Sequence, residues 1–350
     1  MIGQIGKAAA LMMTATATLA ASPAGTMQSY DGYRSWLVVC DNTLSCVAKG
    51  FGDESQGAEI VIERDAGAKG TLAASISVPH RFALKDIMID GKPAGLDARS
   101  WSVSASADEN AATSDDLVAI RALVQRLRNA TKVTITGGEA ISLDGFAAAM
   151  LRMDDRQGRS GGVTALLKPG ALPASGVPKA PPVPRVPNRP VTATLAAGEA
   201  NRLIAAIRAD QKAVFAKEDC GDTPEKPEAY ALDAGRALVF VPCIMGAYQG
   251  SSLGFIAPRK GGRAQRLVAP TPYLGNDPDR SDVAYFTEAS FDPKTGTLST
   301  AAKGRGMADC GMSASWIWDG KAFQLSEMNL QQSCGGIEPG DWPTLYRSVR

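Results

Sequence analysis

The sequence predicts a mainly β, α+β fold divided into two antiparallel, β-rich domains, each stapled by disulfide bonds. Three observations lead to this prediction. Short runs of alternating apolar and polar residues recur between turn-forming residues, a proline-rich segment interrupts the chain near its middle, and six cysteines are present. At 350 residues, the chain is long enough for two domains that each bury a core.

Residues 1–24 have the composition of a secretory signal peptide. A single cation, Lys7, precedes an apolar run over residues 8–21, and small residues follow it, in the order typical of a cleavable export signal. The run is too short to span a bilayer as a helix, which takes about 20 apolar residues, and no later stretch qualifies. A disordered cytosolic tail is the alternative.

Residues 28–168 form the predicted N-terminal domain, which is β-rich and contains two helices. Alternating or β-prone runs predict strands at residues 36–40, 59–62, 73–78 and 87–89. The dipeptide Asp90-Gly91 then indicates a two-residue hairpin turn, because a type I′ turn requires positive φ at both central residues.

Two helices interrupt the strands of this domain. The first follows the polar residues 114–116 and carries apolar residues at helical spacing from Leu117 to Leu127. We expect the second helix to begin near Ser142 as its N-cap and to bury Phe146, Met150 and Leu151.

Residues 169–190 are predicted to be a linker, because eight of these 22 residues are prolines and few are apolar enough for a core. Proline favours polyproline II, which rises about 3.1 Å per residue, so we expect a semi-rigid spacer. The functional alternative is a proline-rich ligand for a partner domain.

Residues 191–350 form the predicted C-terminal domain, one helix followed by an antiparallel sheet. The pattern predicts a single amphipathic helix over residues 199–215. Turn signals recur at Ala234-Gly235, at residues 292–296 and at Asp319-Gly320, with β-prone runs between them.

The hairpin over residues 314–325 can be predicted in register. If Asp319-Gly320 is a two-residue turn, Trp318 faces Lys321, Trp316 faces Phe323, and the two tryptophans share the more apolar face. We expect Trp316 to be buried and Trp318, nearer the turn, to stay partly exposed over Lys321.

The six cysteines predict disulfide bonds in an oxidising compartment. If no bridge crosses the linker, Cys40 pairs with Cys46, and for the other four we prefer Cys220 with Cys243 and Cys310 with Cys334 among three options. A zinc site is the weaker alternative, because no C-x-x-C motif occurs and the only histidine, His80, is distant in sequence.

The charge balance argues against polyanionic partners. Lys and Arg number 37 and Asp and Glu number 36, so no bulk charge draws the chain to nucleic acid or to an anionic membrane. We predict no nucleic-acid partner, and no integral membrane segment in the mature chain.

Two short motifs invite a catalytic or metal-binding interpretation. Residues 250–254 fit the G-x-S-x-G pattern and nominate Ser252 as a nucleophile, but no histidine follows it in the chain, so a glycine-flanked loop between strands is the favoured interpretation. Asp154 and Asp155 could bind a cation, although a solvated helix end is more common.

The C-terminal domain holds the residues of a possible binding surface. Arg305 and Asp309 lie in a glycine-rich segment beside Cys310, where an anion-binding nest is conceivable but a turn with the two side chains paired is favoured. Tyr248, Trp318 and Trp342, with Trp316, could line a groove for a glycan or peptide, although core packing is the favoured interpretation.

Several segments together resemble the bacterial family catalogued as domain of unknown function 1176. They are residues 36–50 (WLVVCDNTLSCVAKG), 153–159 (MDDRQGR), 238–249 (LVFVPCIMGAYQ), 303–311 (KGRGMADCG), 315–320 (SWIWDG) and 341–346 (DWPTLY). The N-terminal part is also distantly similar to invasion-associated locus B proteins, through its tryptophan and two-cysteine pattern. The resemblance implies export and unknown biochemistry, and supplies no catalytic residues.

The resulting hypothesis is an exported periplasmic protein that binds another envelope component, a protein or a glycan, and catalyses nothing. We predict no cofactor and no metal site, because each catalytic constellation above lacks a partner residue. The alternatives are a hydrolase of envelope material that uses carboxylates alone, as glycosidases do, or an inhibitor of a wall-degrading enzyme. The ligand, the oligomeric state, the cleavage site and the domain that carries the site stay open.

Overall fold

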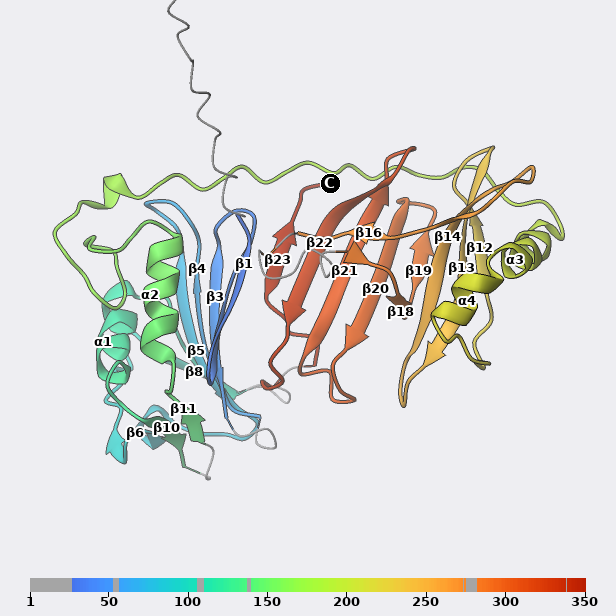
Figure 1. The fold of residues 1–350 in the computed structure, drawn as a ribbon. Coiled ribbons are helices and arrows are strands. Elements are labelled where there is room, and N and C mark those ends of the chain that lie inside the picture. Colours follow the sequence, from blue (N-terminus) through green and yellow to red (C-terminus); the bar gives the residue numbers. More distant parts are fainter. Residues whose placement is uncertain are drawn as a thin grey trace, which may run out of the picture.

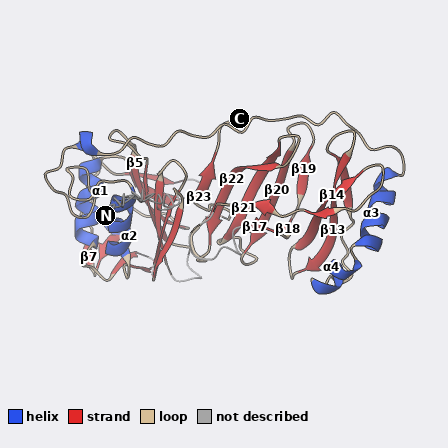
Figure 2. Ribbon diagram, turned by 45° about the horizontal axis from the view of Figure 1, so that its top comes forward, coloured by secondary structure: helices blue, strands red, loops and turns tan. Residues whose placement is uncertain are grey.

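The structure is a computed structural model that describes residues 27–52, 57–105, 110–136, 140–272, 274, 282–337 and 339–350. The predicted signal peptide, residues 1–24, lies outside the described residues. We call residues 27–168 the N-terminal half and residues 191–350 the C-terminal half. Figures 1 and 2 show a row of strands with two helices at each end. All pairs of strands are antiparallel, which confirms the predicted β-rich α+β fold class.

The described residues contain four α-helices and two short 3₁₀ helices. They are α1 (Leu117–Leu127), α2 (Phe146–Arg156), α3 (Glu199–Asp210), α4 (Lys212–Lys217), and the 3₁₀ helices Leu84–Asp86 and Ala174–Gly176. None of the helices in this part of the chain is long and apolar enough to cross a membrane.

A seven-stranded sheet, in the order β1-β2-β3-β4-β5-β9-β8, dominates the N-terminal half. Its strands are β1 (Ser29–Tyr33), β2 (Trp36–Cys40), β3 (Cys46–Phe51), β4 (Glu59–Arg64), β5 (Leu72–Val78), β9 (Asn110–Ser114) and β8 (Ser102–Ala105). The runs predicted at residues 36–40, 59–62 and 73–78 are thus strands, and they are neighbours in one sheet.

One face of this sheet, which we call the inner face, packs on helices α1 and α2. Trp36, Ile60 and Ile76 are buried there in one apolar cluster with residues of both helices. The indole of Trp36 lies edge-on to Phe146 at 4.8 Å and donates to the Ser142 carbonyl. Gly50 stands opposite Trp36, and a Cβ at that position would lie only 2.3 Å from the indole, so this pair requires glycine.

A small four-stranded sheet closes the end of this core, in the order β11-β10-β6-β7. Its strands are β6 (Ile87–Ile89), β7 (Lys92–Pro93), β10 (Lys132–Ile135) and β11 (Ala140–Ser142). Ile89 pairs with Lys92 around Asp90-Gly91, whose φ angles are +48° and +76°, so the two-residue hairpin prediction is confirmed.

Both helices predicted in this half are present. The start of α1 is as predicted, and α2 starts later in the chain than predicted. Helix α1 begins after Asp116, whose carboxylate accepts the Val118 and Ala119 amides as an N-cap. Helix α2 begins only at Phe146, after Gly145 at φ +97°, because Ser142 pairs with Lys132 in strand β11 and is not the N-cap. Phe146 and Met150 are buried as expected.

The described residues of the C-terminal half form two five-stranded sheets and a two-stranded ribbon. The first sheet comprises β12 (Glu228–Ala231), β13 (Arg236–Met245), β14 (Gly250–Pro258) and β15 (Gln265–Arg266), with β18 (Phe286–Thr287) also paired to β14. The second, in the order β19-β20-β21-β22-β23, comprises β19 (Ser290–Asp292), β20 (Thr297–Lys303), β21 (Gly311–Trp318), β22 (Phe323–Gln331) and β23 (Thr344–Arg347). The ribbon pairs β16 (Ala269–Pro270) with β17 (Asp282–Val283).

Helices α3 and α4 cover one face of the β12–β15 sheet, where Leu203 and Ile207 join the apolar cluster of Val239 and Val241. The prediction of one continuous helix over residues 199–215 was wrong. The backbone leaves helical geometry at Gln211, whose side chain is buried and donates to the Ala264 carbonyl. Fixing this amide inside the core redirects the chain into α4.

A single apolar cluster joins the two halves. Leu37 and Val39, on the outer face of β2, are fully buried together with Leu238, Phe240 and Trp316 of the C-terminal half. Strand β2 is therefore buried along both faces, with Trp36 and Val38 in the inner cluster.

The predicted register of the β21–β22 hairpin was wrong by two residues. Trp318 pairs with Phe323 and Trp316 with Leu325, because the connection is a four-residue loop rather than a two-residue turn. The Asp319 carboxylate accepts the Lys321 and Ala322 amides and so stabilises the longer loop. Because the shift is even, the tryptophans still share a face.

Trp318 is not partly wet as predicted. Its side chain is only 2% exposed, lies 5.2 Å from the Phe323 ring and is covered by the Arg236 guanidinium at 4.7 Å. It therefore packs in the core as Trp316 does.

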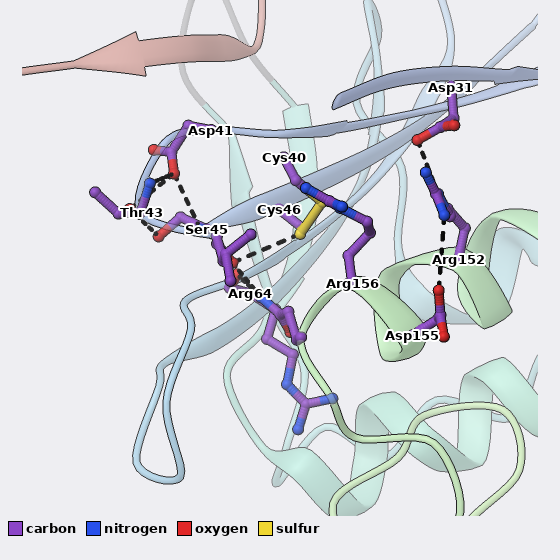
Figure 3. The surroundings of a disulfide bond; sticks show 12 residues. Asp31, Cys40, Asp41, Thr43, Ser45, Cys46, Arg64, Arg152, Asp155 and Arg156 are labelled. Atoms are coloured by element: carbon purple, nitrogen blue, oxygen red, sulfur yellow. Dashed lines mark hydrogen bonds and ion pairs between the residues drawn. A yellow bond between two sulfur atoms is a disulfide. The ribbon is translucent and has the colours of Figure 1, made fainter. Parts of the chain in front are cut away.

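The disulfide predictions are confirmed. Cys40 bonds to Cys46, Cys220 to Cys243, and Cys310 to Cys334, and the described residues contain no free cysteine. Figure 3 shows the first bridge beside the β2–β3 turn, where the Asp41 carboxylate accepts the Thr43 and Ser45 amides.

Residues 169–190 run along the molecule from the α2 end toward the α3 end (Figure 1). Apart from the 3₁₀ turn Ala174–Gly176, they form isolated bridges and backbone hydrogen bonds, such as that from Val186 to Val349 at 2.9 Å. The division into two domains at this segment stays a prediction.

Replacing Trp316 tests the core of the C-terminal half. Its side chain is fully buried and its indole donates to the Pro270 carbonyl at 2.7 Å. We expect Trp316→Ala to lower the free energy of unfolding by about 3 to 5 kcal/mol, through lost burial and an unfilled cavity. Chemical denaturation measures this, and a variant as stable as the wild type would contradict the assignment.

Candidate functional site

The outer face of the seven-stranded sheet is divided by its chemistry into two parts. Over β1 to β3 it is apolar and buried against the C-terminal half, through Leu37 and Val39 with the partly buried Tyr30 and Phe51. Over β4, β5 and β9 it carries carboxylates and small polar side chains. The C-terminal half covers the first part, and a groove lies over the second.

This groove has a volume of about 620 Å³. It is lined by Glu59, Val61, Glu63, Ala73, Ala74, Ser75, Ala98, Arg99, Ser100, Trp101, Ser102, Thr113, Ser114, Asp115 and Asp341. A smaller cavity of about 180 Å³ shares Val61, Glu63 and Asp341 with it and continues toward Trp342 and Arg347. Both halves of the chain therefore contribute to the lining.

Strand alternation explains the floor of the groove. In β4, Ile60 and Ile62 point into the inner core, so Glu59, Val61 and Glu63 must point outward. On the neighbouring strand, Ala73 is opposite Glu63 and Ser75 is opposite Val61. These side chains are too small to fill the space beside the carboxylates, and the groove stays open.

Asp341 enters the groove from the connection between β22 and β23. The Cys310–Cys334 bridge ties this connection to the start of β21, and the Trp342 indole donates to the Ala308 carbonyl at 3.1 Å. Trp342 is 8% exposed and packs over Gly311. The predicted surface residue Trp342 therefore supports the wall of the site as a largely buried side chain.

Lys49 joins the two halves electrostatically. Its ammonium donates to the Asp341 carboxylate at 2.7 Å and to the Asp341 carbonyl at 2.8 Å, and it lies 3.6 Å from the Glu59 carboxylate. The Lys49 side chain is only 3% exposed. One buried cation thus compensates a carboxylate from each half, and fixes Asp341 at the edge of the groove.

A second polar link crosses the seam near the smaller cavity. Asn42 donates to the Arg347 carbonyl at 3.0 Å and accepts the Arg347 amide at 2.8 Å. The Arg347 guanidinium also forms an ion pair with the buried Asp41, which organises the β2–β3 turn. These contacts hold β23 against the end of β2.

The groove is acidic, and Glu63 is a carboxylate of its lining without a paired cation. Four carboxylates and one guanidinium, that of Arg99, line it, and Arg99 is already paired with Asp97 at 2.7 Å. Glu63 forms no hydrogen bond or ion pair within the described residues. Partial burial against the groove walls and the negative charge of Asp341 raise the pKa of Glu63.

Two of the predicted binding residues, Arg305 and Asp309, form the ion pair that the sequence favoured. The guanidinium Nε donates to the Asp309 carboxylate at 2.7 Å and lowers the pKa of that carboxyl group. The Asp309 carbonyl accepts a hydrogen bond from the Gln331 side-chain amide. The polar groups of this turn therefore bind other groups of the protein.

The other predicted aromatics are dispersed. Tyr248 is 46% exposed in the loop between β13 and β14, and hydrogen bonds between Gln249 and Lys303 join that loop to the Arg305 segment. Trp318 is buried in the C-terminal core. Of the five residues proposed from the sequence, Trp342 alone lines a cavity of the seam described above.

Ser252 is not in a loop as the sequence suggested. It pairs with Pro242 inside strand β14 and is 7% exposed. His80 lies in the N-terminal half, where its ring contacts the Thr136 carbonyl at 3.0 Å. The geometry provides no histidine base for Ser252.

Asp154 is not a solvated helix end. It is 1% exposed, accepts the Leu166 and Leu167 amides, and lies 3.6 Å from the Arg64 guanidinium. Its neighbour Asp155 forms an ion pair with Arg152, which also binds Asp31 of β1 (Figure 3). Asp154 therefore fixes α2 to the surrounding chain, whereas Asp155, whose side chain is 69% exposed, pairs only within the helix and is the solvated helix end that the sequence favoured.

Comparison with known proteins identifies the family. A family model described as a protein of unknown function, DUF1176, matches residues 30–349. The chain belongs to this family. It is also 31% identical over 328 residues to the uncharacterized protein YpfG of Escherichia coli K12, covering 90% of this chain and 91% of that protein. No solved structure matches the chain.

Every residue that lines the groove lies within the segment that matches the family model. Sequence reasoning missed the groove because its lining comes from separate segments between residues 59 and 115, with Asp341 added from the far end of the chain. One local signal was present. Glu59 and Glu63 alternate with apolar residues in a strand that lies in the middle of the sheet, which marks a polar outer face.

Removing Lys49 tests the electrostatic link between the halves. We expect Lys49→Met to lower the free energy of unfolding by about 3 to 5 kcal/mol, because the buried Glu59 carboxylate loses its compensating cation. The double variant Lys49→Met/Glu59→Gln should recover most of this loss in urea denaturation. Equal stability of Lys49→Met and the wild type would show that the link contributes nothing.

Glu63 should make stability depend on pH. Because its folded-state pKa lies above the unfolded value of about 4.3, the ionised carboxylate opposes folding at neutral pH. Glu63→Gln should therefore melt at a higher temperature than the wild type at pH 7. The difference should disappear below about pH 4.3, where Glu63 is protonated in both states.

The control is Glu327→Gln, the same change of charge on an exposed side chain outside the groove. A Glu63→Gln variant that is less stable than the wild type at pH 7 would contradict the electrostatic description of the groove.

Proposed function

We propose that this protein is an exported, non-catalytic binding protein of the bacterial envelope, and that the groove is its ligand site. The observation that carries this proposal is the groove itself, a preformed cavity of about 620 Å³ on the outer face of the N-terminal sheet with Asp341 of the C-terminal half at its edge. Preformed clefts of roughly 300 to 1,000 Å³ with a few convergent polar groups are the usual form of ligand sites.

The lining supports a polar ligand from the envelope, either a glycan or a segment of another protein. Glu63 and Asp341 offer carboxylate acceptors, and Ser75, Ser102 and Thr113 offer hydroxyl groups. Hydroxyl-rich or cationic groups would find partners along this surface. The described residues that line the groove include no histidine and no cysteine, the usual bases and nucleophiles, which favours binding over turnover.

Export is supported by three features of the chain. Residues 1–24 have the composition of a signal peptide. The three disulfide bonds fit an oxidising compartment such as the periplasm. The third is the pattern of Trp36, Cys40 and Cys46, which resembles that of exported invasion-associated locus B proteins, although the family model that matches the chain is a different one.

A carboxylate hydrolase is the second candidate, and one observation favours it. Glu63 and Asp341 line the same groove, and a pair of carboxylic side chains across a binding site is the arrangement that glycosidases use. Hydrolysis of isolated cell-wall material that is lost in both Glu63→Gln and Asp341→Asn would establish this candidate in place of the binding role. An inhibitor of a wall-degrading enzyme would instead be captured together with that enzyme.

Site-specific photocrosslinking tests the groove as a binding site. A benzoylphenylalanine at Thr113, on the floor of the groove, should form an adduct in the periplasm, whereas one at the exposed Lys92 of β7 should not. Ser75→Trp, which fills the space between the strands, should weaken capture by the Thr113 probe at least roughly tenfold. Equal adducts from both positions, or none from Thr113, would contradict the proposal.

The mature protein tests export directly. Cleavage after Ala17, Ala21 or Ala24 should give an N-terminus between Thr18 and Met27 on protein recovered from the periplasm. Thiol titration of that protein under denaturing, non-reducing conditions should find no free cysteine. An intact Met1, or four or more free thiols, would overturn the assignment.

A further inference from the structure

A second cavity lies beneath the proline-rich segment, on the C-terminal half. Its volume is about 610 Å³, and residues 185–189, which we call the strap, form one side of it. The opposite side is formed by β21, β22 and β23, where Leu325 and Tyr346 lie on the same face of the sheet as Trp316, and Pro270 closes it further. This lining is mainly apolar, in contrast to the acidic groove.

Backbone hydrogen bonds hold the strap on both sides of the cavity. At one side, the Val186 amide donates to the Val349 carbonyl and the Val349 amide donates to the Pro184 carbonyl, both at 2.9 Å. At the other side, the Arg189 amide donates to the Thr295 carbonyl at 2.9 Å. Between these points stands Pro187, which has no amide hydrogen and a fixed φ. The strap is therefore held by hydrogen bonds at both ends, so the cavity between it and the sheet is formed by the fold itself.

The charges at the rim favour an anion. Arg185 and Arg189 both line the cavity, are solvent-exposed, and form no guanidinium hydrogen bond or ion pair within the described residues. Asp319, a carboxylate in the same lining, is already used by the Lys321 and Ala322 amides and by the Gln324 side chain. Arg185 has no carboxylate partner in this lining, and Arg189, which packs against Gly320, has its charge only partly balanced by Asp319. The cavity therefore has two cations at its rim.

We propose that this cavity binds a free long-chain fatty acid. Its alkyl chain would lie on Leu325 and Tyr346 beneath Pro187, where burial of apolar surface contributes roughly 25 cal/mol per Å². Its carboxylate would bind Arg185 and Arg189, since guanidinium groups pair with carboxylates in bidentate geometry. This site is separate from the groove and does not depend on the function proposed for it.

Titration of the intact mature protein with dodecanoate, below its micelle concentration, tests the proposal. Dodecanoate should bind saturably with one site per chain, and butyrate, which keeps the carboxylate but shortens the chain, should not compete. Dodecyltrimethylammonium, with the same chain and the opposite charge, should bind at least roughly tenfold more weakly. Binding of the two surfactants with equal affinity would overturn the proposal, as would displacement of dodecanoate by an apolar peptide in stoichiometric amounts.

Variants locate the site. Arg185→Glu/Arg189→Glu should raise the dodecanoate Kd at least roughly tenfold, whereas the charge-matched control Arg208→Glu/Arg263→Glu, on exposed arginines elsewhere, should not. Leu325→Trp should reduce binding by filling the chamber without changing charge, and melting curves confirm that each variant is folded. Ser75→Trp in the groove should leave dodecanoate binding unchanged. Unaltered affinity in both the arginine variant and Leu325→Trp would overturn the assignment.

Discussion

Strand β2 is buried along both faces, and the rest of the structure depends on this constraint. Trp36 and Val38 pack on the helical side, while Leu37 and Val39 pack on the C-terminal half. Each such side chain contributes roughly 1.5 to 3 kcal/mol when it is fully removed from water. A strand without a polar face requires a layer on either side, so the N-terminal sheet cannot bury its apolar surface without the second half of the chain.

The outer face of the same sheet changes from apolar to polar side chains between β3 and β4, and the groove lies over the polar part. Beyond β3 the outer face carries Glu59, Glu63 and small residues, which offer little apolar area to a covering layer. The C-terminal half therefore stops at this boundary, where Lys49 bonds to Asp341 and approaches Glu59. A buried ion pair of this kind contributes little net free energy to folding, but an arrangement that left Lys49 buried without a carboxylate would cost several kcal/mol. Lys49 therefore determines the relative position of the two halves more than the strength of their association. Asp341 therefore lies at the edge of the groove, where the apolar contact between the two halves ends.

Local sequence signals predicted the elements whose causes are local. Asp116 caps α1 and Asp90-Gly91 turns the chain as expected, because each acts through its own neighbouring amides or φ angles. The β21–β22 register was missed because the Asp319 side chain stabilises a longer loop than the Asp319-Gly320 dipeptide suggests. The break after α3 was missed because the partner of Gln211, the Ala264 carbonyl, is remote in sequence.

The candidate site was harder to predict, because its walls come from distant segments. Three of the aromatics that looked available for a ligand, Trp316, Trp318 and Trp342, pack inside, as their apolar area would favour. The charged residues of β4, which looked unremarkable in sequence, form the floor of the groove, because only the packed structure shows which half of the sheet is left open.

The central claim is that β2 couples the two halves into one cooperative unit and so holds Asp341 of the C-terminal half at the edge of the groove. Scanning calorimetry of the mature, disulfide-intact protein tests it most directly. The account predicts a single transition whose calorimetric and van't Hoff enthalpies agree, with Leu37→Ala moving the whole transition to lower temperature. Two separable transitions, with Leu37→Ala shifting only one of them, would contradict it.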